Sequence, residues 1–421
     1  MERALGLETF LTGTEGIGGV IKEEPEDFVV REVPLELPRN ENGAYCVFWM
    51  KARNWETNAL LSLLSRRLRI NRSSIHIAGT KDKRAISEQL VTIKTREAVD
   101  PGIDGLEMRY LYRTDKKLYL GGLYGNEFFV RVRHCRNVEN VPELCEELRE
   151  NGGFPNFFGV QRFGIARPNT HRIGKMIVEG DYKGAVLSYI CEPGEYDSEE
   201  VRKAKDIALE GRFGDALDLF PRSFEFERLM LVSLAKKEDY VSAIRALPLN
   251  LRTMLVYAYQ SYLFNRILSE RIRRGLANSL LLGDIIVPID EHLNPEEEEI
   301  PVREYNIAKV ERNFRKGRCA PTGAIPGYDS AFACRDEGEI ENNVLREAGF
   351  ERKEDLKRFL VYHLPELSAR GLRRPLQVNS SIRYEIEDDS TVSFSFYLPK
   401  GTYATSLLRE FMKSDDLRAY G

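Results

Sequence analysis

The sequence predicts an α+β protein in which a mostly helical segment interrupts two groups of strands. Three observations lead to this prediction: strand-like runs over the first 135 residues, helical periodicity from Lys175 to about Gly275, and a return of strand-like sequence near Ile382. A chain of 421 residues is too long for one ordinary core, so we expect two large domains.

The first segment is predicted to form a sheet with one helix. The helix runs from about Trp55 to Leu68, because its leucines recur on one apolar face. The strand-like runs are Val29–Val33, Tyr45–Met50, Ile75–Ala78, Leu90–Ile93 and Phe129–Arg133.

The character of the sequence changes after Gly152-Gly153. Helices dominate, including one from Thr253 to Arg274 that stops at Gly275. The Gly/Pro-marked or charged stretches 294–300 and 322–328 are predicted loops of this region. Strands return at 382–386 and 392–397, before a short helix from about residue 405. If the late strands join the early sheet, the helical block is an insertion into one discontinuous domain.

Composition excludes several classes of protein. The chain is 42% apolar and 30% charged, which is too balanced for a disordered protein, and it has no run of about 18 apolar residues and no signal-like start. We therefore expect a soluble cytoplasmic protein. The six cysteines form no C-x-x-C pair, and His134 beside Cys135 has no second pair to complete a ligand set, so we expect buried thiols and no metal site.

Charge is unevenly distributed along the chain. The net charge is −4, yet from Lys51 to Arg84 nine basic residues face two acidic ones, a local balance of +7. By contrast, the run Glu296–Glu299 would repel phosphate. Such clusters are equally compatible with solvated faces, so charge alone does not decide for a polyanionic partner.

A single carboxylate stands out in the basic region. Asp82 lies between Lys81 and Lys83, just after a short strand, so it is expected on a loop. The basic neighbours favour its ionised form, which suits a nucleophile or base that approaches a phosphate backbone. A charged β-turn with a surface ion pair explains the same spacing, and from spacing alone that reading is favoured.

Aromatic residues interleaved with amides and arginine form a second theme. They occur at 125–129 and 154–164, where Phe rings could stack on unpaired bases and Asn or Gln could read base edges. Core packing is the ordinary use of such rings. The polar helix segment 257–266 could equally contact RNA or pack on the first domain, and the helix after Tyr403 could present its N-terminal amides to phosphate. No P-loop, G-x-S-x-G or H-E-x-x-H motif is present.

Taken together, these segments resemble the TruD family of tRNA pseudouridine synthases. Six blocks match in the same order along nearly the whole chain, which makes coincidence implausible and favours the catalytic reading of Asp82. The matching blocks are Ile21–Val30, Ala78–Ala85, Gly125–Phe128, Asn156–Gly164, Ser261–Asn265 and Leu398–Ser406.

The resemblance implies a pseudouridine-synthase catalytic domain around a mixed, largely antiparallel sheet, with an inserted, mostly helical α+β TRUD domain. We place the catalytic domain at residues 1–153 and 371–421 and the insertion at 154–370. The implied partner is tRNA, the implied target is U13, and no cofactor is implied. We expect a monomer.

The resemblance also assigns roles to residues. Asp82 is the implied catalytic aspartate, and Lys22 is the implied basic residue that faces it. The implied substrate-binding residues are Phe28, Asn126, Phe128 and Tyr403. The residues we expect to bind RNA are Lys81, Lys83, Arg84 and Arg162.

Two features depart from the family pattern. Position 403 is Tyr where Phe is expected, which keeps the stacking plane but adds a hydroxyl that needs a partner. The insertion is also longer than in compact bacterial members, in the stretch Leu276–Tyr328 that holds the acidic run.

Three functions stay open at this point. In an isomerase, Asp82 would either attack C1′ or remove the C2′ proton, and the sequence does not choose between them. A non-catalytic tRNA-binding or folding module would use the same basic and aromatic surface. A base-removing glycosidase would use the carboxylate to release uracil.

Overall fold

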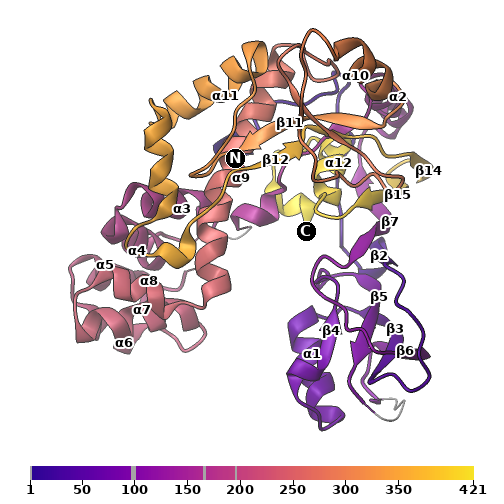
Figure 1. Ribbon diagram of the computed structural model, residues 1–421. Helices are drawn as coiled ribbons and strands as arrows, with labels where there is room; N and C mark the ends of the chain where they lie inside the picture. Colours follow the sequence, from indigo (N-terminus) through magenta and orange to yellow (C-terminus); the bar gives the residue numbers. More distant parts are fainter. Residues whose placement is uncertain (1, 96–100, 165–166, 195–196) are drawn as a thin grey trace.

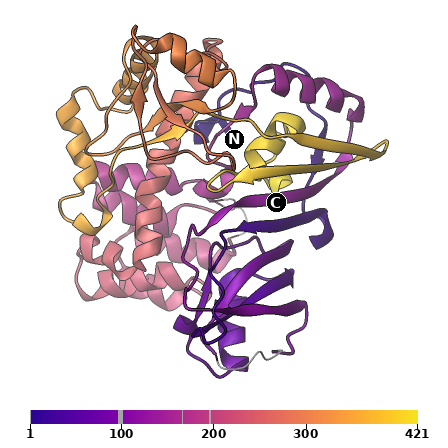
Figure 2. The ribbon, with the colours of Figure 1, turned by 45° about the vertical axis from the view of Figure 1, so that its right-hand side comes forward.

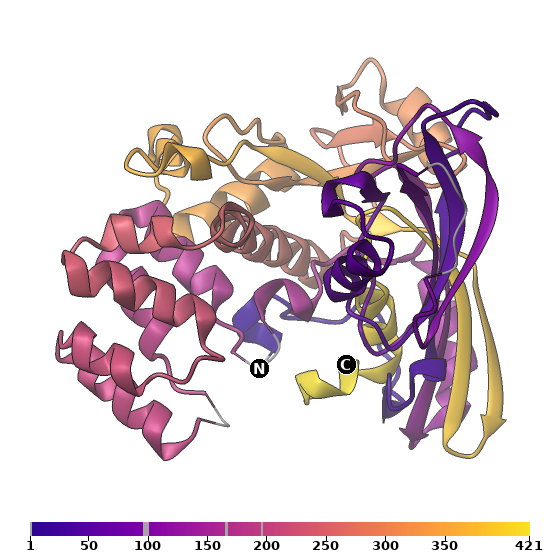
Figure 3. The same cartoon turned by 90° about the horizontal axis from the view of Figure 1, so that it is seen from below.

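The computed structural model describes residues 2–95, 101–164, 167–194 and 197–421. A sheet and a group of helices form its two sides, and both project in the same direction, downward in Figure 1. Seen from below, the long helix α9 (Leu249–Arg273) and the C-terminal helix α12 (Ala404–Met412) lie between these two sides (Figure 3).

The main sheet is mixed and largely antiparallel. Within the described residues its strand order is β14-β15-β7-β2-β5-β3-β6, with β1 beside β7 and β4 beside β5. The pair β2–β5 is parallel, and the other pairs are antiparallel. The strands are β1 Gly18–Val20, β2 Phe28–Pro34, β3 Tyr45–Arg53, β4 Ile75–Ile77, β5 Ile86–Ile93, β6 Leu106–Thr114, β7 Leu123–Cys135, β14 Ile382–Asp388 and β15 Thr391–Pro399. This architecture confirms the predicted fold class.

The late strands do join the early sheet. β15 pairs with β7 from Val392 to Pro399, for example Phe396 with Phe128, and Figure 2 shows the two strands side by side. Helices α1 (Thr57–Arg67), α2 (Val141–Glu150) and α12 pack on this sheet. The alternation of apolar and polar residues along β15 directs its apolar side chains to the face that packs on α12, where Phe394 meets Phe411.

The segment between these strands has its own core. Its helices are α3 Thr170–Glu179, α4 Tyr182–Cys191, α5 Glu199–Leu209, α6 Phe213–Leu219, α7 Glu225–Lys236, α8 Tyr240–Ala246, α9, α10 Ile307–Phe314 and α11 Arg335–Glu347. A small sheet in the order β10-β9-β11-β12 completes it, with β9 Ile285–Pro288, β10 Ile300–Pro301, β11 Cys319–Ile325 and β12 Leu372–Pro375.

Short crossing segments contact both parts. Residues 154–163 contribute Phe154, Phe157 and Phe163 to the core of the main sheet, and β8 (Phe154–Pro155) pairs with β13 (Gln377–Val378). In the other direction, β12 pairs with β11 of the small sheet. The chain therefore passes between its two parts through residues that anchor each to the other.

The predicted strands and helices are present, but strand β6 and helix α2 were not predicted and one predicted loop is wrong. The helix predicted at about Trp55–Leu68 is α1, and the predicted helix from Thr253 is the C-terminal part of α9. The loop predicted at 322–328 is wrong, because residues 322–325 belong to β11. That strand has small side chains rather than bulky ones because it packs tightly on α9: a Cβ on Gly323 would lie 3.3 Å from the Phe264 ring.

A buried ion cluster joins α9 to the small sheet and α11. The guanidinium of Arg271 lies 2.8 Å from Asp284 and 2.7 Å from Glu337, and all three side chains are inaccessible to solvent. Arg271 also donates to the carbonyls of Leu276 and Ser279. Its hydrogen-bonding capacity is thereby used within the insertion.

His171 at the start of α3 is expected to make the protein acid-sensitive. The ring lies between Phe163 and Tyr262, its Nδ1 has no partner, and burial lowers its pKa from about 6.5 to about 4. Because the folded-state pKa is depressed, the neutral ring's stabilisation is present above pH 6.5 and is lost as the pH falls toward 4. The free energy of unfolding should drop by about 2–3 kcal/mol over this range.

His171→Phe keeps an aromatic ring in this position but cannot titrate. Denaturant unfolding at pH 7 and pH 4 should therefore show a smaller acid sensitivity in His171→Phe than in the wild type. An unchanged pH dependence in the variant would contradict the assignment.

Four of the six cysteines are buried as expected, and Cys145 is half-buried. Burial raises the pKa of Cys135, Cys145, Cys191 and Cys319 to about 11, whereas Cys334 is exposed. Among the described residues there is no group of three or more His, Cys, Asp or Glu suited to a metal ion. In the same part of the chain, no helix combines the length and apolar character needed to cross a bilayer.

Candidate active site

Asp82 lies on the loop between β4 and β5, half-exposed to solvent. The first residue of α1 fixes this loop: Thr57 Oγ1 accepts from the backbone N–H of Lys81 at 2.8 Å and donates to its carbonyl at 3.1 Å. The N-terminus of α1 therefore holds the loop, 24 residues after Thr57 in the sequence. Asp82 extends from the backbone that these bonds fix.

Lys22 reaches Asp82 from the segment before β2. Its Nζ lies 3.1 Å from Asp82 Oδ2 and 4.4 Å from the centre of the Phe28 ring, and its side chain is only 5% exposed. β2 and β5 are parallel, so the segments that precede them meet at one edge of the sheet. The structure thus brings Lys22 and Asp82 together, with the lysine buried and the carboxylate accessible to solvent.

One face of the sheet beside this pair carries aromatic rings. Phe28 of β2 meets Phe128 of β7 edge-to-face at 5.9 Å, and Phe128 stacks on Phe396 of β15 at 5.4 Å. Asn126 shares this face, two residues before Phe128 on the same strand. Its Oδ1 is buried without a hydrogen-bond partner. Such an orphaned acceptor is costly unless a ligand supplies a donor, so it points to a polar group bound here.

Tyr403 belongs to a neighbouring aromatic group. It is the N-cap residue of α12 and meets Phe158 edge-to-face at 6.1 Å. Phe158 is held in turn by Asn265 of α9, whose side chain bonds both its N–H and its carbonyl. β15 pairs with Asn126 at Leu398, five residues before Tyr403, so the turn after β15 links the two aromatic groups. Among the described residues, the Tyr403 ring contacts Phe158 and makes no ring contact with Phe28 or Phe128.

The helix segment 257–266 serves packing more than an exposed surface. Gln260, Ser261 and Asn265 are buried, and Gln260 donates to the carbonyls of Pro326 and Arg370. Tyr257 remains 42% exposed. The structure therefore favours the packing alternative for most of this segment.

The residues expected to bind RNA are not equivalent. Lys83 and Arg84 are exposed, and Arg162 is half-buried and donates to Ser261. Lys81 differs from the expectation: its side chain is only 6% exposed, and its Nζ lies 3.1 Å from Glu32, which is fully buried. Burial of the charged carboxylate raises the pKa of Glu32, and Lys81 opposes that rise. Lys81 is thus turned into the protein and is not available for phosphate.

Sequence reasoning missed Glu32 and Arg374. Glu32 follows Phe28 and Val30 at a spacing of two, so it occupies a core-facing position of β2, which is an unusual place for a carboxylate. That pattern could have identified it. Arg374 lies 4.4 Å over the Phe158 ring, and burial lowers its pKa to about 10 while Tyr403 raises it and Arg162 lowers it. Only the fold brings Arg374 near Tyr403.

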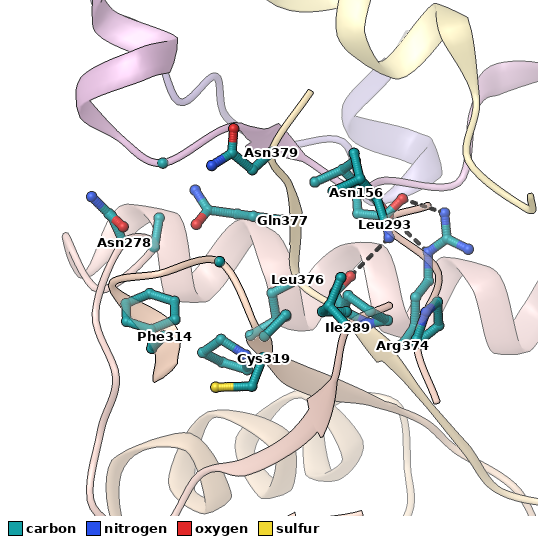
Figure 4. A pocket seen from close by; sticks show the side chains of 18 of the residues that line it. Asn156, Asn278, Ile289, Leu293, Phe314, Cys319, Arg374, Leu376, Gln377 and Asn379 are labelled. Atoms are coloured by element: carbon teal, nitrogen blue, oxygen red, sulfur yellow. Dashed lines mark hydrogen bonds between the residues drawn. The ribbon is translucent and has the colours of Figure 1, made fainter. Parts of the chain in front are cut away.

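A cavity of about 820 Å³ opens beside these residues, between the small sheet and the main one (Figure 4). Asn156 and Arg374 line it, and the turn formed by Pro399, Lys400 and Thr402 closes one side. Asp82, Phe28 and Asn126 are not among its lining residues. This cavity is therefore next to the Tyr403 turn and not at the carboxylate.

Comparison with known proteins agrees with this geometry. The family model for tRNA pseudouridine synthase D (TruD) matches residues 4–411. The chain belongs to the TruD family. Proteins named "Probable tRNA pseudouridine synthase D" from Methanosarcina mazei and Archaeoglobus fulgidus are each 37% identical to it, over 99% of this chain and 98% and 100% of theirs.

A solved structure extends the TruD match to three dimensions. The crystal structure described as that of a TruD protein from Methanosarcina mazei superposes with a TM-score of 0.85 at 36% identity, covering 99% of this chain and 98% of that one. The long insertion and the discontinuous main sheet are therefore part of a fold that this TruD relative shares.

Proposed function

We propose that this TruD protein isomerises a uridine of tRNA to pseudouridine in the cytoplasm, that the uridine is U13, and that Asp82 is the catalytic carboxylate. The observation that carries the proposal is the Lys22–Asp82 pair: a half-exposed carboxylate, paired with a buried ammonium, beside an aromatic face with an unpaired amide oxygen. An isolated surface ion pair would not need that face.

Each residue of this face has a different role in the proposed reaction. Lys22 stabilises the ionised Asp82, which acts at the ribose of a nucleotide turned out of the RNA. Phe28 and Phe128 hold the detached uracil by their rings, and the free Oδ1 of Asn126 is placed to accept from its N–H edge. The exposed Lys83 and Arg84 follow Asp82 on the same loop and suit the adjacent phosphates.

The chemistry balances without any added reactant. The N1–C1′ bond breaks, the uracil turns within the pocket, C5 bonds to C1′, and the proton from C5 is lost while N1 gains one. Asp82 either attacks C1′ or removes the C2′ proton to give a glycal-like intermediate. Either route needs one ionised carboxylate close to the ribose.

The test is to map pseudouridine in an unmodified tRNA transcript after incubation with the purified protein, using carbodiimide-block sequencing. We expect one modified position, 13, and none in a matched transcript that carries cytidine there. Modification of other positions only would contradict the choice of U13, and no modification of any tRNA would contradict the proposed activity.

Chromatography of the same reaction separates isomerisation from base removal. An isomerase releases no free uracil, whereas a glycosidase would release it in proportion to the tRNA consumed. A non-catalytic binding module would give neither product.

Tyr403 is expected to act through its ring plane. Tyr403→Phe should leave kcat/KM within about twofold, whereas Tyr403→Ala should lower it by about 5- to 100-fold, since loss of one base-stacking ring costs about 1–3 kcal/mol. Initial rates on the tRNA transcript measure both. A large loss in Tyr403→Phe would instead assign a role to the hydroxyl, whose neighbour is Arg374.

A further inference from the structure

We propose that Lys81 and Glu32 are positioning residues for the reaction. Their buried ion pair ties the loop that carries Asp82 to the part of strand β2 that lies opposite Asn126. The inference rests on the proposed catalytic role of Asp82. It also replaces the expectation that Lys81 contacts RNA.

The pair lies beneath the loop. Lys81 Nζ is 3.1 Å from Glu32 Oε2, and the two side chains are 6% and 0% exposed. The second carboxylate oxygen, Oε1, accepts from the backbone N–H of Leu90 at 3.3 Å. Each oxygen of Glu32 therefore has a partner, one from the loop and one from strand β5.

The position of Glu32 within the sheet explains why a carboxylate belongs there. The parallel pairing of β2 and β5 ends at Arg31–Glu88, one residue before Glu32. Beyond that point the backbone N–H of Leu90 donates to the Glu32 carboxylate instead of to a backbone carbonyl of β2. On its other side Glu32 lies directly opposite Asn126 of β7. Glu32 thus connects the Asp82 loop, strand β5 and the substrate-facing Asn126.

The two neighbouring side chains of the loop have different tasks. Asp82 points outward to Lys22 and is half-exposed, while Lys81 points inward to Glu32. If the ion pair with Glu32 is removed, the two backbone hydrogen bonds to Thr57 still hold Lys81, but its side chain no longer does. A displacement of about 1 Å at a reacting group can cost about 10²-fold in rate, so the anchor matters for turnover even though it does not touch substrate.

Glu32 lies between Asn126 of β7 and Gln89 of β5, and these three residues form a row across the sheet. Two buried acceptors without partners in this row suggest that it belongs to a functional site and does more than stabilise the fold. Asn126 Oδ1 and Gln89 Oε1 are both buried without partners, and Gln89 lies on β5 one residue after the end of the β2–β5 ladder. Stability alone does not require a buried ion pair, since well-packed apolar side chains often replace one without loss. Asn126 lies on the aromatic face beside Asp82, so a bound substrate can supply the donor that its free Oδ1 lacks.

The decisive variant is Lys81→Met, compared with Lys83→Met two residues away. Lys81→Met should lower kcat about 10²-fold while the Kd for tRNA and its salt dependence stay close to wild type. Lys83→Met should act on affinity, reducing the slope of log K against log salt by about 1. Lys81→Arg, which keeps the charge, should recover part of kcat.

Opposite results would overturn the proposal. If Lys81→Met weakened tRNA binding and reduced the salt slope with kcat unchanged, Lys81 would be an RNA contact. If Lys81→Met does not fold, Lys81→Met/Glu32→Gln removes both charges. This double variant should fold, as judged by circular dichroism and thermal unfolding, and still turn over about 10²-fold more slowly, whereas wild-type kcat in it would refute the positioning role.

Asp82→Asn, measured in parallel, separates this inference from the proposed function. An active Asp82→Asn would remove the proposed function itself. An inactive Asp82→Asn together with a fully active, folded Lys81→Met would leave the function standing and refute only the role of the Lys81–Glu32 pair.

Discussion

Replacing Asp82 with Asn is expected to abolish pseudouridine formation while tRNA binding is retained. Asn keeps the size and the polar contact of the side chain, but it can neither attack C1′ nor accept the C2′ proton. The rate of pseudouridine formation on a tRNA transcript should fall by more than about 10³-fold, as is usual when the central group of a reaction is removed. The Kd measured by filter binding should stay within about threefold.

The matched control for this prediction is Asp104→Asn. Asp104 is an exposed carboxylate of the same sheet domain, outside the Lys22–Asp82 face, and the same chemical change there should leave turnover unaltered. Wild-type activity in Asp82→Asn would show that the carboxylate is a surface ion pair, and a folding or binding module would then be the better reading.

Replacing Arg271 with Met is expected to give the largest loss of stability. The guanidinium is the shared partner of Asp284 and Glu337, and burial raises the pKa of Glu337 even beside it. Met has a similar length but leaves two buried carboxyl groups without their cation. Breaking such a buried pair costs about 3–5 kcal/mol, which urea unfolding would measure as a lower midpoint.

Arg274→Met, one turn along, provides the comparison. Arg274 pairs with Glu270 and Glu339 where solvent reaches the side chains, so its loss should cost no more than about 1 kcal/mol. Equal effects of the two variants would mean that the buried cluster contributes no more than a surface pair.

The sequence predicted most of the fold because its periodicities are local. Strands such as β2 and β15 alternate clearly, and α9 carries an uninterrupted apolar face, so they were predicted within a few residues. β11 was missed because its small residues are selected by contact with α9, which is a long-range property that local alternation does not record.

The candidate site was predictable only in part. Lys22, Phe28 and Asn126 came from resemblance, and the structure places them on one face with Asp82 or directly beside it. The inward direction of Lys81 could not be read from its charge, because in an irregular loop a lysine beside an aspartate can point either way. Arg374 was out of reach for a different reason: its neighbours Phe158 and Tyr403 come from segments far apart in the chain.

The pairing of β15 with β7 has a consequence for biosynthesis. Ser406 of α12 bonds the carbonyl of Phe157 across 249 residues of sequence, and β15 completes the aromatic face beside Phe128. During synthesis on the ribosome, β2, β5 and β7 emerge early. The edge of β7 and the aromatic face remain unpaired, however, until β15 has left the exit tunnel near the end of synthesis. The helical insertion also needs residues up to Ala369 and strand β12 to complete its core and its small sheet, so both parts of the protein are finished only as the end of the chain emerges, and no uridine can be isomerised before then.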